Sequence, residues 1–560
     1  MKTLGIRDII GPIMIGPSSS HTAGALRIAL MTRKLLAAEP VEAEFFLYGS
    51  FAHTYHGHGT DRALLAGMLG LRPDDERIRD SFELAEAAHL AYEFHPLPND
   101  ETRHPNTVEI RVRDLTGTVI RVRGESIGGG SARIREIDGV EVLLSGEYHS
   151  LVVKQRDVRG VLAFIAGAVA DEGINIATTR LFRDKRGTLA YTVMETDDAL
   201  PEPLRDALLK NSDIYNVSML PSDRASEPHA PMSVEEELAC GIEPTGFGTE
   251  MGAEEASVLF ERLDFATGSE LLAYCEETGL PISDAICRRE RCLLAMNGIA
   301  VDDTKRYLNE CLRIMRVSVE SSLEAARPSM GGLIGGESIA LAAYGTRDDA
   351  LFGAADGALM AYAIAAGMAV LETNASMGRI VAAPTAGSAG VVPAVLFAMQ
   401  RSKGFTDHQV QRALANAAAI GMLIARTSTV AGAEGGCQAE VGTASAMAAS
   451  AAVELMGGSP AQCFAAASTA LSNLMGLVCD PIGGLVEAPC QKRNAIGAAN
   501  ALLAAQLALA GVGSVIGFDE TVWAMDTVGR SLPFELRESA LGGLAATPTA
   551  CALCAKDCGV

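Results

Sequence analysis

The sequence predicts a multidomain protein, with an α+β region first, a compact βαββαβ region next and a mostly α-helical region last. At 560 residues the chain is too long to fold around one hydrophobic core. Segments with apolar side chains at every second position, which are typical of strands, fall within the first 221 residues. Beyond residue 250, apolar stretches rich in Ala, Gly and Met dominate, and these favour helices.

Residues 1–147 form the predicted α+β domain. The stretch EAEFFLYGSFA indicates a strand that ends in a turn at Gly49 and Ser50. Two further stretches, TVEIRVRD and TGTVIRVRGESIGGG, alternate apolar and polar residues and predict a hairpin with its turn at residues 115–117. A helix is expected to begin near Thr22 and to continue through AGALRIALMTRKLL.

Residues 149–221 predict a separate unit with the order βαββαβ, the ferredoxin-like arrangement. Its first helix, in RGVLAFIAGAVADEG, is expected to end at Gly173. The segment RDVRGVLAFIAGAVADEGINIATTRLFR resembles the ACT domain family. That resemblance implies an amino-acid effector site that includes Gly160 and Asn175. The alternative is a module that only dimerises, because a fold does not by itself define a function.

The remaining chain predicts a linker and a helical domain. Residues 222–250 are polar and acidic and contain proline, as expected for a linker. Residues 251–560 are the predicted helical domain, whose Gly-rich connections would carry any chemistry. Its most apolar stretch, Ala501–Phe518, is expected to be buried core rather than a membrane span.

The charge of the chain excludes two classes of partner. There are 46 basic and 69 acidic residues, which give a net charge of −23. This negative charge argues against nucleic acid and against an anionic membrane surface. The N-terminus shows no signal-peptide pattern, since Arg7 and Asp8 interrupt its apolar run. A cytoplasmic location is therefore expected.

The twelve cysteines are expected to be free thiols or metal ligands rather than disulfides. Those on helical patterns are expected to be small core residues: Cys240, Cys275, Cys287, Cys292 and Cys311. Cys437 in GAEGGCQAEVG, and Cys479 and Cys490 in CDPIGGLVEAPCQKRN, instead lie beside Gly or Pro. Such positions suit an iron–sulfur cluster, and three ligands would leave one iron open as a Lewis acid. Buried, unreactive cysteines remain the alternative.

The segment GPSSSHTAG gathers hydroxyl groups, glycines and an imidazole at the expected start of a helix. Hydroxyls, backbone N–H groups and the positive end of a helix are suited to binding an anion. The alternative is a cluster of residues that only caps the helix.

Histidines form a second cluster of candidate functional residues near the N-terminus. Four of the ten lie between residues 21 and 58, namely His21, His53, His56 and His58. A zinc site formed by His53, His56 and His58 is one alternative, although no carboxylate pattern completes it beyond Asp61, and a polar loop without chemistry is the other. His104, which precedes Pro105, fits either a supporting role at a site or a simple turn.

Long motifs resemble the bacterial iron–sulfur L-serine dehydratases. In the C-terminal region these are CDPIGGLVEAPCQKRN, GCQAEVGTASAMAA, SMGRIVAAPTAGSAGVVPAVL and GGLIGGES, which are similar to the α-region of that family. GPSSSHTAG and GSFAHTYHGHGTD are similar to its β-region. The resemblance implies one fused chain: a β-region over 1–147, similar to an allosteric substrate-binding domain, an ACT domain over 149–221, a linker over 222–250 and an α-region over 251–560.

The resemblance also implies roles for single residues. Cys437, Cys479 and Cys490 would hold a [4Fe–4S] cluster, and His58 would be the catalytic base, with His56 in reserve. The residues implied at the substrate are Ser18, Ser19, Ser20, His21, Thr22, Asn374, Ser376, Arg379, Thr385 and Ser388, of which His21 is also a catalytic candidate. No Ser-x-Lys loop of the pyridoxal phosphate type is present.

The implied reaction is β-elimination from L-serine, which yields pyruvate and ammonia. The β-hydroxyl would be activated at the open iron while a base removes the α-proton. Two alternatives stay open: an iron–sulfur L-cysteine desulfidase, and an amino-acid-sensing protein without catalysis. A homodimer is expected from pairing of ACT domains.

The tail CALCAKDCGV carries Cys551, Cys554 and Cys558. Related enzymes can place a C-terminal cysteine on the open iron, so Cys558 is a hypothetical fourth ligand. An oxidation-prone or zinc-binding tail is the alternative, because a terminus holds a cluster poorly.

Overall fold

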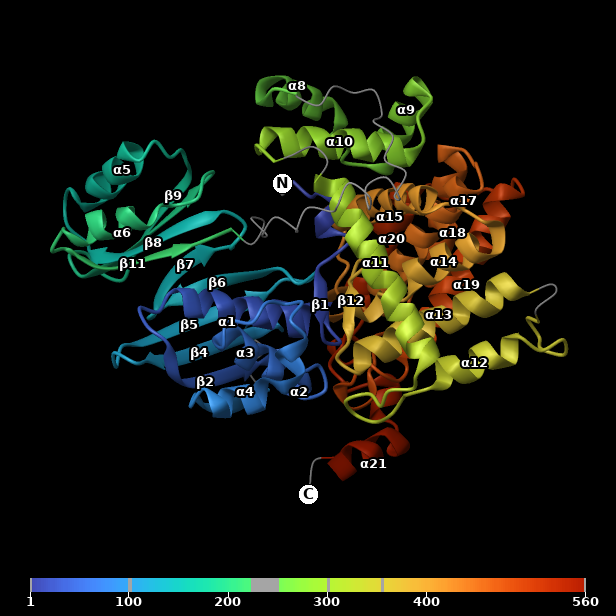
Figure 1. Ribbon diagram of the computed structural model, residues 1–560, viewed down its shortest axis with the longest axis horizontal. Helices are drawn as coiled ribbons and strands as arrows, with labels where there is room; N and C mark the ends of the chain where they lie inside the picture. The colour runs from blue at the N-terminus through green and yellow to red at the C-terminus, as the bar shows by residue number, and fades with distance from the viewer. Residues whose placement is uncertain (1–2, 99–102, 223–250, 300–302, 354–356, 558–560) are drawn as a thin grey trace. The chain divides into compact units, whose positions relative to one another are not determined.

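The computed structural model describes residues 3–98, 103–222, 251–299, 303–353 and 357–557. These residues form two compact units. The helical unit comprises Met1–Ser19, His56–His58 and Met232–Val560, and the sheet unit comprises Ser20–Tyr55 and Gly59–Pro231. Figure 1 labels their elements. The N-terminal region is thus rich in sheets and the C-terminal region is mostly helical, as the sequence predicts.

The helical unit is built around α17, Thr443–Leu455, which packs against α14, α15, α18 and α19 (Figure 1). Every residue of α17 from Thr443 to Val453 is buried, and most are Ala or Ser, so neighbouring helices can approach closely on all sides. The other larger helices of the unit are α8 Ala253–Leu263, α9 Gly268–Thr278, α10 Ile282–Met296, α11 Asp303–Glu324, α12 Glu337–Gly345, α13 Ala358–Ala375, α14 Val391–Lys403, α15 Asp407–Thr427, α18 Pro460–Asn473, α19 Cys490–Leu509, α20 Phe518–Ser531 and α21 Pro548–Asp557.

Short elements connect these helices. They are η1 Ile6–Asp8, η4 Ala386–Ser388, α16 Gly432–Gly435, η5 Gln438–Gly442, η6 Ile482–Gly484, η7 Phe534–Leu536 and η8 Gly543–Ala546. A small antiparallel sheet joins β1, Ile13–Ile15, to β12, Arg379–Val381. The first residues of the chain are therefore part of the helical unit, which a local pattern does not reveal.

Apolar helices of this unit are mostly buried. Among the described residues, α13 is the one helix long and apolar enough to cross a membrane, and 72% of that stretch is buried inside the protein. The expectation for Ala501–Phe518 is only half right. Ala501, Ala504 and Ala508 on α19 are buried, but the helix ends at Leu509 and Val515 is 99% exposed. The glycines at positions 511, 513 and 517 explain why the helix does not continue.

In the sheet unit, six strands form a sheet in the order β3-β2-β4-β5-β6-β7, with only β2 and β3 parallel. The strands are β2 Pro40–Tyr48, β3 Ala91–Leu97, β4 Thr107–Asp114, β5 Val119–Ser126, β6 Ala132–Ile137 and β7 Val140–Leu144. Its helices are η2 Ser19–Gly24, α1 Ala25–Lys34, α2 Gly49–Thr54, α3 Thr60–Met68, η3 Glu76–Asp80 and α4 Ser81–Ala87.

The hairpin β4–β5 has the predicted strands, and Gly117 in its turn has a φ of +85°. Two predictions for this unit are corrected. Gly49 and Ser50 begin the helix α2 instead of forming a turn, and the first helical turn starts at Ser19 rather than near Thr22.

Four antiparallel strands complete the sheet unit, in the order β11-β8-β10-β9. The elements are β8 His149–Arg156, α5 Val161–Asp171, β9 Ile176–Arg183, β10 Leu189–Thr196, α6 Glu202–Leu209 and β11 Ile214–Leu220, so the predicted order βαββαβ is present. Ile165 on α5 and Leu204 on α6 pack with Leu151 and Val153 of β8 in one core. The predicted linker, apart from Ser222, lies outside the described residues.

Candidate functional site

A pocket in the helical unit brings together cysteine, histidine and glutamate side chains that could bind a metal or transfer a proton. It contains about 360 Å³ of space not filled by atoms, part of it open to solvent. Its lining residues come from six separate segments of the chain: Pro17, Ser18, His58, Gly387, Cys437, Glu440, Val441, Cys479, Pro481, Val486, Cys490 and Glu538. Three cysteines, a histidine and two carboxylates therefore surround one space.

Two of the three cysteines sit where a helix begins, and the third lies in an extended segment. Cys437 lies between α16 and η5, directly after Gly436, whose φ of +75° turns the chain at that point. Cys490 is the first residue of α19, where the helix dipole favours a negative sulfur. Cys479 lies in an extended segment whose N–H donates to the Leu536 carbonyl. All three are more than 90% buried.

The sulfurs of Cys437 and Cys479 and a carboxylate oxygen of Glu440 lie within 4.8 Å of one another. A hydrogen bond with Cys479 and the nearby Arg493 guanidinium lower the pKa of Cys437. The same hydrogen bond, together with burial, raises the pKa of Cys479, and burial raises that of Cys490. Loss of solvent and the Glu538 carboxylate raise the pKa of Glu440.

These donors fit an iron–sulfur cluster. Three thiols from separate segments open onto one pocket, and a buried cation lies beside one of them. Thiolates are the ligands that such clusters take, and a positive group offsets part of their charge. The cysteines on helix interiors, such as Cys311 and Cys463, do not line this pocket.

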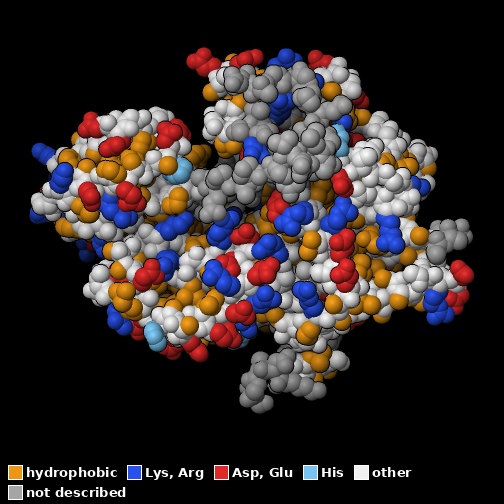
Figure 2. Space-filling view, in the orientation of Figure 1, with side chains coloured by type: hydrophobic (Ala, Val, Ile, Leu, Met, Phe, Trp, Pro, Cys, Tyr) orange, Lys and Arg blue, Asp and Glu red, His pale blue; other side chains and the backbone are white. Residues whose placement is uncertain are grey.

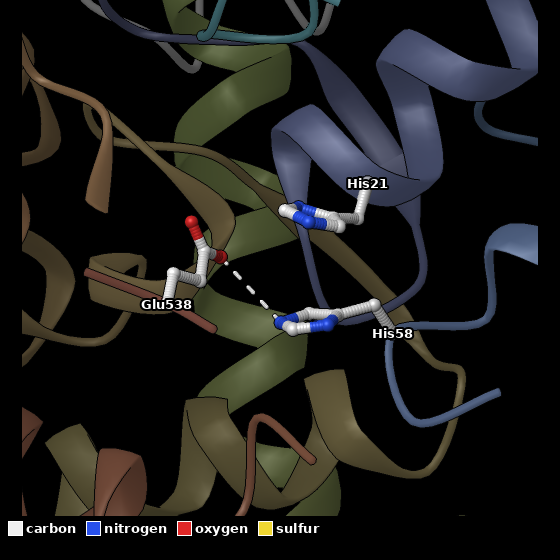
Figure 3. Close-up of side chains that lie close together, drawn as sticks. All are labelled: His21, His58 and Glu538. Carbon is white, nitrogen blue, oxygen red and sulfur yellow. Dashed lines mark ion pairs between the residues drawn. The ribbon is translucent and has the colours of Figure 1, made fainter. Parts of the chain in front are cut away.

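His58 lies beside Glu538 at the wall of the same pocket. Its Nε2 lies 3.5 Å from Oε1 of Glu538, and both side chains are at least 94% buried (Figure 3). Glu538 has a φ of +58°, which is unfavourable for a residue with a side chain. Its backbone N–H donates to the Cys479 carbonyl, so the strained segment is bonded directly to a cysteine.

Close backbone packing holds His58 at this position. A Cβ added to Gly57 would lie 2.5 Å from the carbonyl oxygen of Gly484 and 3.0 Å from that of Gly483. Only glycine allows this approach between the histidine segment and the η6 turn that follows Cys479. His56, the reserve base, is exposed and does not line the pocket.

The predicted substrate residues of the helical unit divide into lining and supporting positions. Ser18 lines the pocket, and Asn374 Nδ2 donates to the carbonyls of Pro17 and Ala386 at 3.2 and 3.1 Å. The hydroxyls of Thr385 and Ser388 are 3.0 Å apart, on either side of Gly387, which lines the pocket. These groups therefore shape the wall of the pocket.

Two other predicted substrate residues lie away from the lining. Ser376 Oγ donates to the Thr373 carbonyl at the end of α13. Arg379 begins β12 and pairs with Ile15 of β1. Neither side chain lines the pocket.

From Ser20 onward, the serine segment belongs to the sheet unit. His21 is fully buried there, with Nδ1 2.9 Å from the Ser20 hydroxyl and Nε2 2.9 Å from the Ser50 hydroxyl. Its ring meets the edge of Phe51 at 5.1 Å. Ser19, Ser20 and Thr22 are buried in the first turns of η2.

The two predicted effector residues lie at the ends of elements in the four-stranded part of the sheet unit. Gly160 precedes α5 with a φ of +91°, and nothing lies within 4 Å of an added Cβ. Asn175 precedes β9, and its Nδ2 donates to Asp197 Oδ2 at 2.7 Å.

In the C-terminal tail, Cys551 on α21 is exposed. The side chain of Cys554 and the whole of Cys558 lie outside the described residues.

Sequence reasoning missed Glu538, Glu440 and Arg493. Glu440 and Arg493 stand inside the two cysteine motifs, three residues after Cys437 and Cys490, so helical spacing next to a predicted ligand was a usable signal. Glu538 carries no such signal, because it lies 48 residues beyond the last predicted cluster ligand in the sequence, Cys490 (538 minus 490).

Comparison with known proteins agrees with this arrangement. The family model described as "serine dehydratase beta chain" matches residues 7–136, and "serine dehydratase alpha chain" matches residues 277–545. A Streptomyces coelicolor protein named L-serine dehydratase is 31% identical over 96% of this chain and 98% of its own length. One from Mycobacterium bovis with the same name is 36% identical over 97% and 98%.

Some relatives carry the two regions on separate chains. A Bacillus subtilis protein named as a probable L-serine dehydratase alpha chain is 44% identical, over 51% of this chain and 92% of its own length. The similarity to single-chain relatives, by contrast, runs through nearly the whole of both partners. The chain therefore belongs to the L-serine dehydratase family, as a single polypeptide that combines its beta and alpha regions.

Proposed function

We propose that this protein is an L-serine dehydratase that converts L-serine to pyruvate and ammonia, with a [4Fe–4S] cluster held by Cys437, Cys479 and Cys490. The observation that carries the proposal is the one pocket that these three buried thiols and His58 line together. When bound, the cluster supplies a Lewis-acidic iron that assists loss of the β-hydroxyl group.

The chain's own residues provide the proton transfer. His58 takes the α-proton, the electron pair of that bond forms the Cα–Cβ double bond, and the hydroxyl leaves from Cβ. The aminoacrylate product becomes an imine, and water hydrolyses it to pyruvate and ammonia. Glu538, 3.5 Å from Nε2, stabilises the protonated imidazole. Burial of both side chains strengthens this interaction because water screens it weakly.

Ser18 is the proposed first contact for the substrate carboxylate, since it lines the pocket. Ser19, Ser20, His21 and Thr22, which follow it in the sequence, stay predicted substrate residues. Asn374, Thr385 and Ser388 support the wall of the pocket through the bonds described above. Ser376 and Arg379 do not line the pocket, and their role in substrate binding stays a prediction.

The test is an anaerobic preparation examined by absorption and electron paramagnetic resonance, with and without L-serine. We expect protein-bound iron and sulfide, a cluster signal that changes on adding serine, and pyruvate formation. Parallel turnover of L-cysteine separates the dehydratase from a desulfidase. Absence of iron after reconstitution would contradict the proposal and would favour an amino-acid-sensing protein. A signal that serine leaves unchanged would contradict substrate binding at the cluster.

We further propose that residues 149–221 form an ACT domain that binds a small amino acid beside Gly160 and Asn175, and that the chain is a homodimer. The βαββαβ order supports the domain type, and the open space at Gly160 supports a ligand there. β9 is an edge strand with mostly exposed side chains, a form suited to pairing with a second copy. Analytical ultracentrifugation with and without amino acids tests both ideas.

The remaining expectations stay predictions. They are the domain boundaries at 147, 149, 221 and 250, Cys558 as a fourth ligand, and a cytoplasmic location. Removing residues 551–560 and comparing the resting cluster spectrum tests the role of Cys558. An unchanged spectrum would contradict it.

A further inference from the structure

Arg493 is a buried cation in direct contact with a cysteine sulfur. It lies in the first turn of α19, three residues after Cys490, and its side chain is 10% exposed. Its Nη1 lies 3.6 Å from Cys437 Sγ and donates to the Val478 carbonyl at 2.9 Å. One guanidinium thus connects three parts of the chain: the start of α19, Cys437, and Val478 just before Cys479. Burying a charge in this way is costly unless a partner compensates it.

Asp480 is that partner, and the C-terminal segment holds it in place. Arg493 Nη2 donates to Asp480 Oδ1 at 2.7 Å, and the Leu544 N–H donates to Asp480 Oδ2 at 2.7 Å. Asp480 is 2% exposed, so both carboxylate oxygens are bonded in a buried site. A Cβ on Gly543, whose φ is +60°, would lie 2.3 Å from Oδ2. The segment at Gly543 and Leu544 therefore packs against Asp480 only because position 543 has no side chain.

The direction of the resulting effect follows from electrostatics. A positive group that donates to a thiolate sulfur withdraws electron density and stabilises the more negative, reduced state of a cluster. The planar fork of arginine meets Asp480 with one nitrogen while another points to sulfur and carbonyl oxygen. A lysine has one nitrogen and cannot keep all three contacts in the same geometry.

We propose that Arg493 is a positioning residue for Cys437, fixed by Asp480 and by the segment at Gly543 and Leu544, and that it raises the reduction potential of the cluster. The inference rests on the proposed function, because it requires a cluster at Cys437. It connects the C-terminal segment to a cluster ligand through one continuous chain of hydrogen bonds: Leu544, Asp480, Arg493, Cys437.

The experiment is a mediated redox titration of the anaerobic holoenzyme, followed by electron paramagnetic resonance. The variants are R493M, R493K, D480N and G543A. The matched control is R426K, because Arg426 also bonds a carboxylate, Asp264, at 2.7 Å with its side chain 5% exposed, away from the pocket. We expect the largest negative shift for R493M, smaller shifts in the same direction for R493K, D480N and G543A, and none for R426K.

The outcomes separate the two proposals. Wild-type protein without iron would overturn the proposed function. If the wild-type protein holds a cluster and R493M has the same reduction potential as the wild type and R426K, only the role of Arg493 would be overturned. If R493M or D480N loses its fold by circular dichroism, R493K and G543A decide. A wild-type potential in R493K would overturn the contact to sulfur, and one in G543A would overturn the link through Asp480.

Discussion

Two sets of buried cysteines in the helical unit differ in what surrounds them. Cys311 and Cys463 lie inside helices α11 and α18, and burial raises the pKa of Cys311 to about 12. Cys437 is equally buried, but it follows a turn, faces a second thiol and contacts Arg493, and its pKa is lowered. Burial alone therefore does not mark a reactive cysteine. For Cys437, a turn in the backbone and a nearby cation accompany the lowered pKa, whereas the pKa values of Cys479 and Cys490 are raised.

The largest expected difference between the two sets comes from removing one thiol from each. We expect C479A to lose bound iron and to reduce serine turnover by roughly 10³-fold or more, because it removes a ligand of the Lewis acid. The matched control C463A should keep iron and activity, with a stability loss of about 1 kcal/mol for the small cavity. Iron assays and pyruvate formation measure both. Equal iron loss in the two variants would contradict the comparison.

The second difference concerns the group that faces the pocket cysteines. H58A should keep the cluster spectrum and lower kcat by about 10²–10⁴-fold, because a general base is removed. E538Q should lower kcat by roughly 10-fold to 100-fold and change its pH profile, since the imidazole loses its charged partner. Steady-state kinetics over a range of pH tests both. An H58A enzyme with nearly full activity would place the base elsewhere.

Backbone packing gives a smaller effect that again separates pocket from periphery. G57A would place its Cβ 2.5 Å from the Gly484 carbonyl, where backbone cannot yield easily, so we expect a lower kcat and a stability loss of about 1–3 kcal/mol. The control G167A, on α5, meets nothing within 4 Å and should be neutral or stabilising by up to about 1 kcal/mol. Thermal unfolding and kinetics together check this. Normal kinetics in G57A would mean that this contact does not position His58.

The last effect leaves serine turnover unchanged and is confined to stability, and it tests what burial does to a carboxyl group outside the pocket. Burial raises the pKa of Glu290 on α10 to about 7, although both its oxygens accept the Ile6 N–H. Because the folded state binds this proton more tightly, its stabilising contribution is complete below pH 4.5 and is lost as the pH rises to 7. The loss is on the order of 3 kcal/mol. We expect E290Q to flatten the dependence of unfolding temperature on pH between 5 and 7.5, as measured by calorimetry. An unchanged slope would mean that Glu290 does not cause it.

Local patterns predicted the elements well and the site in part. The hairpin β4–β5 and the order β8-α5-β9-β10-α6-β11 follow from periodicities confined to neighbouring residues. The motifs also indicated Cys437, Cys479, Cys490, Ser18 and His58, which line one pocket. Ser376 and Arg379 share a motif with pocket residues but not the lining, because a motif spans more chain than a site can contact.

The sequence by itself determined that helices rich in small apolar residues would follow two sheet-forming regions. It also determined that cysteines beside Gly and Pro would differ from those on helices. These properties depend on neighbouring residues alone. Only the tertiary structure decided that β1 pairs with β12, that Gly57 packs on Gly484, and that Glu538 and Arg493 stand beside His58 and Cys437. Such pairs join segments up to about 480 residues apart in the chain (538 minus 58), and their contact arises from the packing of the whole helical unit.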